Sequence, residues 1–141
     1  MHLKIIIAKT WTFITPCSQD GSSDLYKFLE NVGQRNEEDA AGLLLKIEAA
    51  AKDEMGPRIL NINMCHKIDG NIYQISSGSL RMLFFYSETK RKVIVCAVCF
   101  LKKGKKTPTK FIDSAKSIEE LYNDSEKKGE VTFLTDKEEQ K

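Results

Sequence analysis

The residues best suited to chemistry on a phosphate are cations gathered around one predicted β-hairpin. They are Lys67, Arg81, Lys102 and Lys103. Lysine and arginine side chains can hold a phosphate and offset the charge of a pentacovalent transition state. Three further side chains are close to them in the sequence, namely His66, Tyr73 and Tyr86. An imidazole can move a proton, and an aromatic ring can stack on a base, so these residue types together indicate a nucleic-acid-binding protein without specifying a reaction.

The charge of the chain is segregated along the sequence. The 141 residues carry a net charge of only +2. Residues 67–110 contain ten lysines and arginines against two acidic residues, a local charge of +8 that leaves −6 on the rest. A basic face on an otherwise neutral body attracts phosphate. The alternative, that these lysines are ordinary solvated charges at turns and helix starts, stays open.

The elements that must position these cations can be predicted from periodicity. Alternating apolar residues indicate strands at Ser79–Ser87 and Lys92–Leu101, preceded by a short strand at Asn71–Ser76. Three strands joined by tight turns form an antiparallel meander. In the middle strand, Arg81 shares a face with apolar residues, where an arginine needs a partner, a rim position or an anion. Tyr86 lies on the opposite face of that strand, with Leu80, Met82 and Phe84.

A helix is predicted directly after the lysine cluster. Thr107 is the expected N-cap and Pro108 the first helical residue, and the apolar stripe continues to about Tyr122. Because Lys105 and Lys106 directly precede this helix, its N-terminal end is a suitable site for an anion.

The N-terminal half predicts two strands followed by two helices. Apolar runs indicate strands at Leu3–Ile7 and Lys9–Ile14, and apolar stripes with polar caps indicate helices at Asp24–Gln34 and Glu37–Met55. The short link between the helices favours an antiparallel helical hairpin. A further strand is expected at Ile59–Met64.

Several other classes of chemistry are not indicated. The cysteines at 17, 65, 96 and 99 lack the spacing of a disulfide scaffold, which favours a reducing cytoplasm. Cys96 and Cys99 lie three apart in a strand and are expected to point to opposite faces, so no shared metal site is predicted. The sequence has no phosphate-binding loop, dinucleotide fingerprint or nucleophile elbow, and we expect no cofactor. No membrane span or signal peptide is predicted.

Three motifs carry a resemblance to a known family. Residues 69–75 read DGNIYQI, residues 80–86 read LRMLFFY and residues 100–108 read FLKKGKKTP. Members of the family often read D-G-L-Y-E-L-R, Y-R-x-x-Y-F-F and F-x-K-K-x-x-K-T-P at these places. From Lys67 to about Leu121, the chain therefore resembles the RelE/ParE toxin superfamily, most closely its HigB-type, phage-derived branch.

The resemblance implies a fold and a partition of the chain. The fold would be α+β, with an N-terminal strand, a helical hairpin, a twisted antiparallel β-meander and a C-terminal helix. Residues 1–124 would form a single RelE/ParE-like toxin domain, and residues 125–141 a charged tail. Within that tail, Val131, Phe133 and Leu134 could dock as a short strand.

The resemblance also implies a function. The chain would be the toxin of a type II toxin–antitoxin pair in the cytoplasm, and its partners would be a cognate antitoxin of the helix-turn-helix class, the ribosome and mRNA. Many relatives cut mRNA in the ribosomal A site, where the 2′-hydroxyl attacks the adjacent phosphate. The expected catalytic residues are Arg81, Lys102, His66 and Tyr86. The expected RNA-binding residues are Lys67, Tyr73, Lys103, Lys105 and Lys106.

One position departs from the family pattern. The arginine that often ends the first motif is Ser76 in this chain. This change removes a cation from the expected site. Three interpretations stay open: the chain is a weak nuclease, a nuclease that uses other residues, or a diverged relative that binds without cutting. A ParE-like toxin that acts on a protein such as gyrase, or a basic nucleic-acid-binding domain without toxicity, are the alternative functions.

Overall fold

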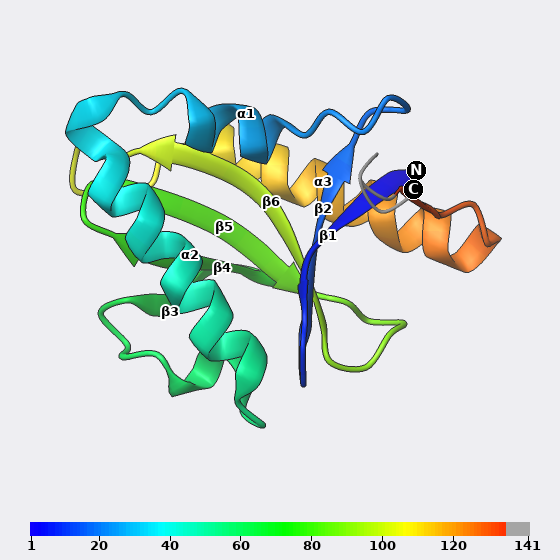
Figure 1. The fold of residues 1–141 in the computed structure, drawn as a ribbon. Coiled ribbons are helices and arrows are strands. Elements are labelled where there is room, and N and C mark those ends of the chain that lie inside the picture. Colours follow the sequence, from blue (N-terminus) through cyan, green and yellow to red (C-terminus); the bar gives the residue numbers. More distant parts are fainter. Residues whose placement is uncertain (135–141) are drawn as a thin grey trace, which may run out of the picture.

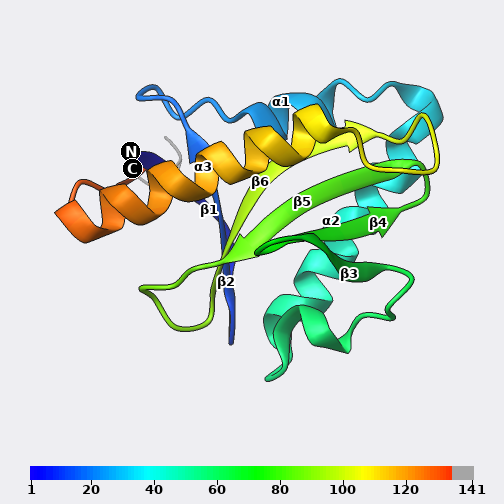
Figure 2. The same ribbon diagram turned by 180° about the vertical axis from the view of Figure 1, so that it is seen from behind.

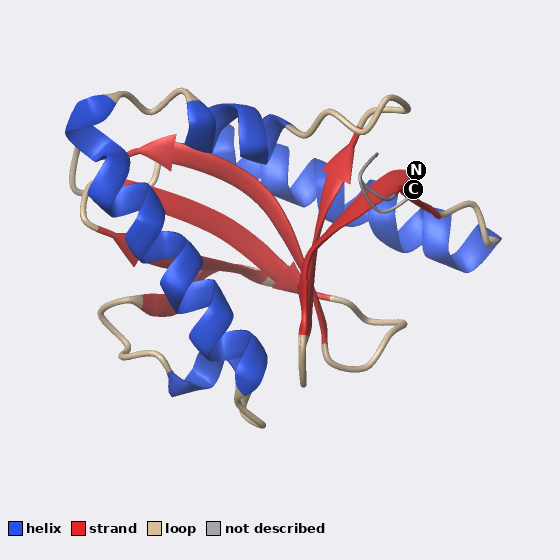
Figure 3. Cartoon of the chain, viewed as in Figure 1, coloured by secondary structure: helices blue, strands red, loops and turns tan. Residues whose placement is uncertain are grey.

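The computed structural model describes residues 1–134 and contains a seven-stranded mixed sheet with helices on both faces (Figures 1 and 3). The fold class is α+β, as predicted. The elements in chain order are β1 (His2–Ala8), β2 (Thr12–Cys17), α1 (Asp24–Glu30), η1 (Gln34–Asn36), α2 (Glu37–Lys52), η2 (Gly56–Ile59), β3 (Cys65–Asp69), β4 (Ile72–Ser77), β5 (Leu80–Tyr86), β6 (Val93–Leu101), α3 (Thr109–Lys128) and β7 (Thr132–Leu134).

The order of the strands in the sheet is β3-β4-β5-β6-β2-β1-β7. Strands β4, β5 and β6 are antiparallel neighbours, so the predicted three-stranded meander is confirmed. Strand β3 pairs antiparallel with β4 and adds a fourth strand that the sequence did not predict. Strand β2 instead pairs with β6 in parallel, and β7 pairs with β1 in parallel. The sheet is therefore mixed, a feature that the sequence did not predict.

The sheet separates two apolar cores. On one face, Phe13, Met82 and Phe84 pack with residues of α1 and α2. On the other face, Phe85 packs against Tyr122 of α3, which crosses the sheet in Figure 2. The alternation predicted for β5 is thus confirmed, and it directs Arg81 to the face covered by α3.

The two N-terminal helices do not form the expected side-by-side hairpin. Helix α1 lies over β6, whereas α2 runs away from it across β4 (Figure 1). Both helices are shorter than predicted and end at Glu30 and Lys52. Gly33 adopts a left-handed φ of +84°, and the turn η1 that follows redirects the chain between the helices.

The prediction of a strand at Ile59–Met64 is wrong. Residues up to Ile59 form the short helix η2, and the following segment is a turn in which the Asn61 side chain accepts a hydrogen bond from the backbone N–H of Asn63. An asparagine that bonds its own backbone in this way favours a turn over a strand. Ile62 is left 75% exposed as a result.

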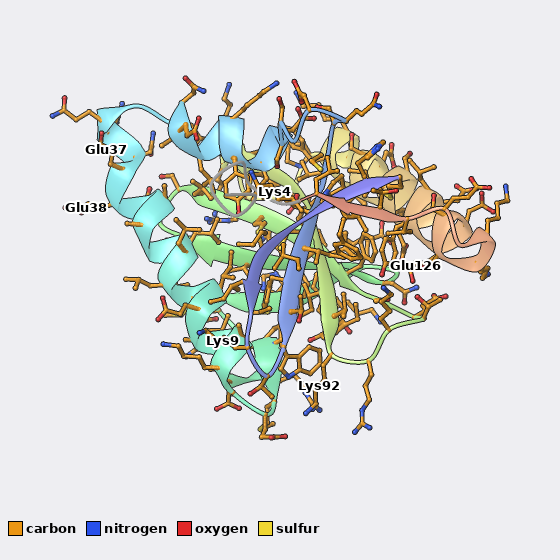
Figure 4. All side chains as sticks on the ribbon, turned by 45° about the vertical axis from the view of Figure 1, so that its right-hand side comes forward. Lys4, Lys9, Glu37, Glu38, Lys92 and Glu126 are labelled. Carbon is orange, nitrogen blue, oxygen red and sulfur yellow. The ribbon has the colours of Figure 1, made fainter. Side chains whose placement is uncertain are left out.

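Helix α3 continues past the predicted end of the domain at residue 124 and ends before Gly129, which adopts a left-handed φ of +69°. The chain then returns to the sheet, where β7 pairs in parallel with β1. Residues 135–141 of the predicted tail lie outside the described residues. Glu126 of α3, which is labelled in Figure 4, accepts a hydrogen bond from the hydroxyl of Thr89 in the turn after β5. None of the helices within residues 1–134 has the length and apolar character needed to cross a membrane.

Candidate functional site

A cavity of about 560 Å³ opens between strand β3, the β4–β5 turn and the loop that leads into α3. It contains Ser76 and six of the residues that the sequence singled out. These are His66, Lys67, Arg81, Lys102, Lys105 and Lys106. The structure therefore brings together side chains from three separate stretches of the chain.

The cavity is strongly cationic. Five of its lining residues carry a positive charge, and none of the described residues that line it carries a carboxylate. Within residues 1–134, none of these five cations forms an ion pair. Unneutralised cations around a cavity attract a polyanion and hold it by charge-assisted hydrogen bonds.

Arg81 occupies the wall of the cavity at the start of β5. Its Nη1 donates hydrogen bonds to the backbone oxygens of Gly78 at 2.6 Å and Leu80 at 2.9 Å. Desolvation lowers the pKa of the guanidinium, and the carboxylate of Asp39 opposes that shift. The guanidinium stays charged at neutral pH because an arginine pKa lies far above that range. Both contacts use Nη1, so the other N–H groups of the planar guanidinium are available to bind an anion.

Asp39, a residue that sequence reasoning missed, fixes the turn that carries Arg81. Its carboxylate accepts a hydrogen bond from the backbone N–H of Ser79 at 3.0 Å, and its backbone oxygen accepts one from the Ser77 hydroxyl at 2.7 Å. Gly78 adopts a left-handed φ of +56°, and a Cβ at that position would collide with the Asp39 carboxylate. The only sequence signal was an acidic residue in the first turn of a helix, which normally indicates a favourable interaction with the helix dipole.

The lysine loop, defined as residues 102–108, is attached to the sheet at both ends. At one end, the backbone N–H of Lys102 donates to the Ser79 oxygen at 2.7 Å. At the other end, the Thr107 hydroxyl donates to Oε1 of Gln74 at 2.7 Å. The predicted N-cap role of Thr107 is wrong, because its hydroxyl is engaged with Gln74 and Pro108 takes the N-cap position. Thr107 instead holds the lysines over the cavity.

Three residues named from the sequence lie outside the cavity. Lys103 is exposed on the lysine loop and does not line the cavity, and Tyr73 and Tyr86 pack on the opposite face of the sheet. Burial raises the pKa of Tyr86 to about 12, so its hydroxyl stays protonated at neutral pH. The phenol of Tyr86 is therefore a hydrogen-bond donor rather than a base, and it does not meet a phosphate held beside Arg81.

Cys96 and Cys99 lie on the same face of the sheet, in contrast to the prediction. The register between β5 and β6 shifts after Leu83, which leaves Ala97 as an extra residue in β6. A bulge of this kind reverses the alternation that the prediction assumed. Within residues 1–134, no three His, Cys, Asp or Glu side chains are grouped as metal ligands.

The thiols provide a test of this packing. Burial raises the pKa of Cys65 to about 11 and that of Cys99 to about 12, and it raises the pKa of Cys17 and Cys96 as well. A raised pKa lowers the fraction of reactive thiolate, so the folded chain at pH 8 should react with an aromatic disulfide reagent about tenfold or more slowly than the unfolded chain. A fast phase in the folded chain that accounts for two or more thiols would contradict this packing.

The arrangement is suited to binding a phosphodiester and stabilising negative charge on it. Arg81 and the lysines surround the cavity, and the imidazole of His66 lines the same cavity. The Ser76 hydroxyl occupies a position across from Arg81, its partner in the β4–β5 ladder. The described residues of the cavity offer no other imidazole and no carboxylate for proton transfer.

Comparison with known proteins gives one family. The family described as phage-derived protein Gp49-like (DUF891) matches residues 35–119. The matched region includes every residue that lines the cavity and extends from η1 into α3. No curated protein matches the chain.

Proposed function

Because the chain belongs to the phage-derived Gp49-like family (DUF891), a toxin-like family, we propose that it is the toxin of a type II toxin–antitoxin pair and cuts mRNA on the ribosome. The observation that carries this proposal is the cavity with five cations and no carboxylate among its described lining residues. Such a cavity accepts the negatively charged backbone of a nucleic acid. The likeness of its motifs to those of the RelE/ParE superfamily supports the same function.

The proposed reaction is an attack within the RNA. The 2′-oxygen forms a bond to the adjacent phosphorus while the bond to the 5′-oxygen of the next nucleotide breaks, which leaves a 2′,3′-cyclic phosphate and a 5′-hydroxyl. Arg81 grips the scissile phosphate and, with Lys102, stabilises the charge that develops on it. His66 takes the proton of the 2′-hydroxyl or delivers one to the 5′-oxygen, and solvent water takes or supplies the other proton. Lys67, Lys105 and Lys106 bind the flanking phosphates.

The lysine loop gives a first test within this proposal. Thr107→Val removes the hydrogen bond to Gln74 and leaves a buried amide oxygen unpaired, so the loop should lose its fixed position above the cavity. We expect RNA affinity to fall about fivefold to tenfold, with a loss of stability of about 1–2 kcal/mol. Fluorescence anisotropy with a labelled RNA and urea unfolding measure the two effects.

Thr109→Val is the matched control, because Thr109 is exposed in the first turn of α3 and does not contact Gln74. An equal loss of RNA affinity in both variants would show that the anchor at Thr107 does not organise the cavity.

A second function is favoured by two observations. Ser76 replaces the arginine found in many relatives, and His66 is the only imidazole among the described residues that line the cavity. A toxin with the same fold that acts by binding a protein such as gyrase needs neither group. A basic nucleic-acid-binding domain without toxicity is the third candidate.

The partners follow from the proposed function. We propose a cognate antitoxin of the helix-turn-helix class, with the ribosome and mRNA as targets in the cytoplasm. Inducible expression in bacteria, followed by pulse labelling, separates the candidates. The mRNA-cleaving toxin should stop methionine incorporation within minutes while thymidine incorporation continues. A prior stop in thymidine incorporation would favour the gyrase-type toxin, and normal growth would favour the non-toxic domain.

A further inference from the structure

A second, smaller cavity lies on the other side of strand β3. Its volume is about 230 Å³, and its walls are mostly apolar and aromatic. The residues that matter for the argument are Arg58, Leu60, Ile62, His66, Tyr73 and Tyr86. It is smaller than the usual site of a drug-sized ligand, and it has room for a single planar ring system.

The aromatic walls of this cavity are held rigidly. The rings of Tyr73 and Tyr86 meet edge to face, with centroids 5.1 Å apart and an interplanar angle of 88°. The ring of Tyr73 also stacks on that of Phe84, with centroids 5.5 Å apart, and the ring of Trp11 meets that of Tyr86 edge to face, with centroids 5.8 Å apart. The tyrosines are thus supported from behind by the core. The Lys67 ammonium lies over the Tyr73 ring, 5.9 Å from its centroid, so a base that stacks on this ring takes the place of that ammonium.

His66 connects this cavity to the cationic one. It lines both, and it lies on β3, which is the outermost strand on its side of the sheet. A strand is narrow, since neighbouring strands lie only about 4.8 Å apart. A polymer whose phosphate lies beside Arg81 can therefore pass over β3 and place its next group among the tyrosines.

From this geometry we propose that the small cavity is a nucleobase pocket, which takes a base of the same RNA strand whose phosphate lies in the cationic cavity. This proposal rests on the proposed function of the cationic cavity. Every base has a flat face that stacks on an aromatic ring, and stacking on tyrosines requires no particular sequence. The exposed guanidinium of Arg58 lies at the rim, where it can donate hydrogen bonds to the edge of a base or to a phosphate. The described residues around this cavity include no carboxylate that would repel the strand.

The test compares a short fluorescein-labelled RNA with the same RNA lacking one base, and it measures dissociation constants by anisotropy. Removing the base that enters the pocket should weaken binding about tenfold to a hundredfold, the range typical of one base stacked on an aromatic side chain. The abasic site is moved along the RNA in successive probes, and only one or two positions should show this loss. The ratio between intact and abasic RNA should change little between low and high salt, because stacking is not screened, whereas both affinities should fall.

Ile62→Asp tests the pocket without disturbing the core, because this side chain is 75% exposed. The added carboxylate should weaken binding of the intact RNA and reduce the difference between intact and abasic RNA, since two changes to one contact are not additive. Leu45→Asp is the matched control, because Leu45 is 66% exposed on α2 and does not line the pocket. It should leave both affinities unchanged.

The outcomes separate this proposal from the proposed function. In one outcome, the chain binds RNA and Arg81→Ala weakens this binding, but neither an abasic site at any position nor Ile62→Asp changes the affinity. That outcome refutes the nucleobase pocket and leaves the cationic site supported. An apolar side chain of a protein partner would then be the better occupant of this cavity. If the chain binds no RNA at all, both proposals fail.

Discussion

Arg81→Ala is expected to abolish growth arrest and to lower the rate of mRNA cleavage by about a hundredfold to a thousandfold, the usual effect of removing one donor from a charge-stabilising site. Its side chain faces the cationic cavity, and within residues 1–134 it has no carboxylate within ion-pair distance. The variant should still fold, because its side chain is only partly buried and its two lost hydrogen bonds to backbone oxygens are worth on the order of 1–2 kcal/mol each at a partly exposed site.

Two companion variants make this prediction specific. Arg81→Lys keeps the charge and loses the planar fork, so an intermediate rate is expected. Arg91→Ala removes the same charge from an exposed position in the β5–β6 turn, outside the cavity, and should leave toxicity unchanged. Growth arrest that persists in Arg81→Ala, at the same protein level as the wild type, would show that Arg81 is not part of the catalytic site.

Phe84→Ala is expected to lower the free energy of unfolding by about 3–5 kcal/mol, as is usual for the loss of a buried phenylalanine. Phe84 is fully buried in β5 and contacts both tyrosines, with its ring stacked on Tyr73 and edge to face with Tyr86 at a centroid distance of 5.9 Å. Its removal leaves a cavity that the rigid neighbouring strands cannot fill. Because this loss is a large part of the stability of a small domain, much of the variant should be unfolded at 37 °C.

Urea unfolding followed by circular dichroism measures this effect. Phe84→Leu is the control, because it keeps most of the buried apolar volume and should destabilise the chain much less. Equal midpoints for the two variants would show that Phe84 does not occupy the packed position described for β5.

The order of strands in the meander could be predicted because it depends on local patterns. Alternation in residues 79–101 and the short turns between the strands fix their pairing. The parallel contact of β2 with β6 joins Thr12 to Val93, and no local signal indicates a pairing over such a separation. The bulge at Ala97 was equally invisible, because its effect on Cys96 and Cys99 arises from the register with β5.

The cationic site could be predicted in part for the same reason. Lys102 and Arg81 lie near the same end of paired strands, so a hairpin brings them together. The alternation of β5 also placed Tyr86 opposite Arg81, and a strict use of that rule would have kept Tyr86 away from the phosphate. Asp39 was missed because its contact with the β4–β5 turn depends on how α2 crosses the sheet. Tertiary packing of this kind leaves no signature in a single sequence.

The most direct measurement is cleavage of a defined mRNA by the purified chain, with and without translating ribosomes, followed by mapping of the new ends. We expect cuts inside translated codons, only when ribosomes are present, with 5′-hydroxyl ends and no cuts by Arg81→Ala. An intact mRNA in the presence of ribosomes, at protein concentrations that arrest growth in cells, would contradict cleavage as the function of this chain.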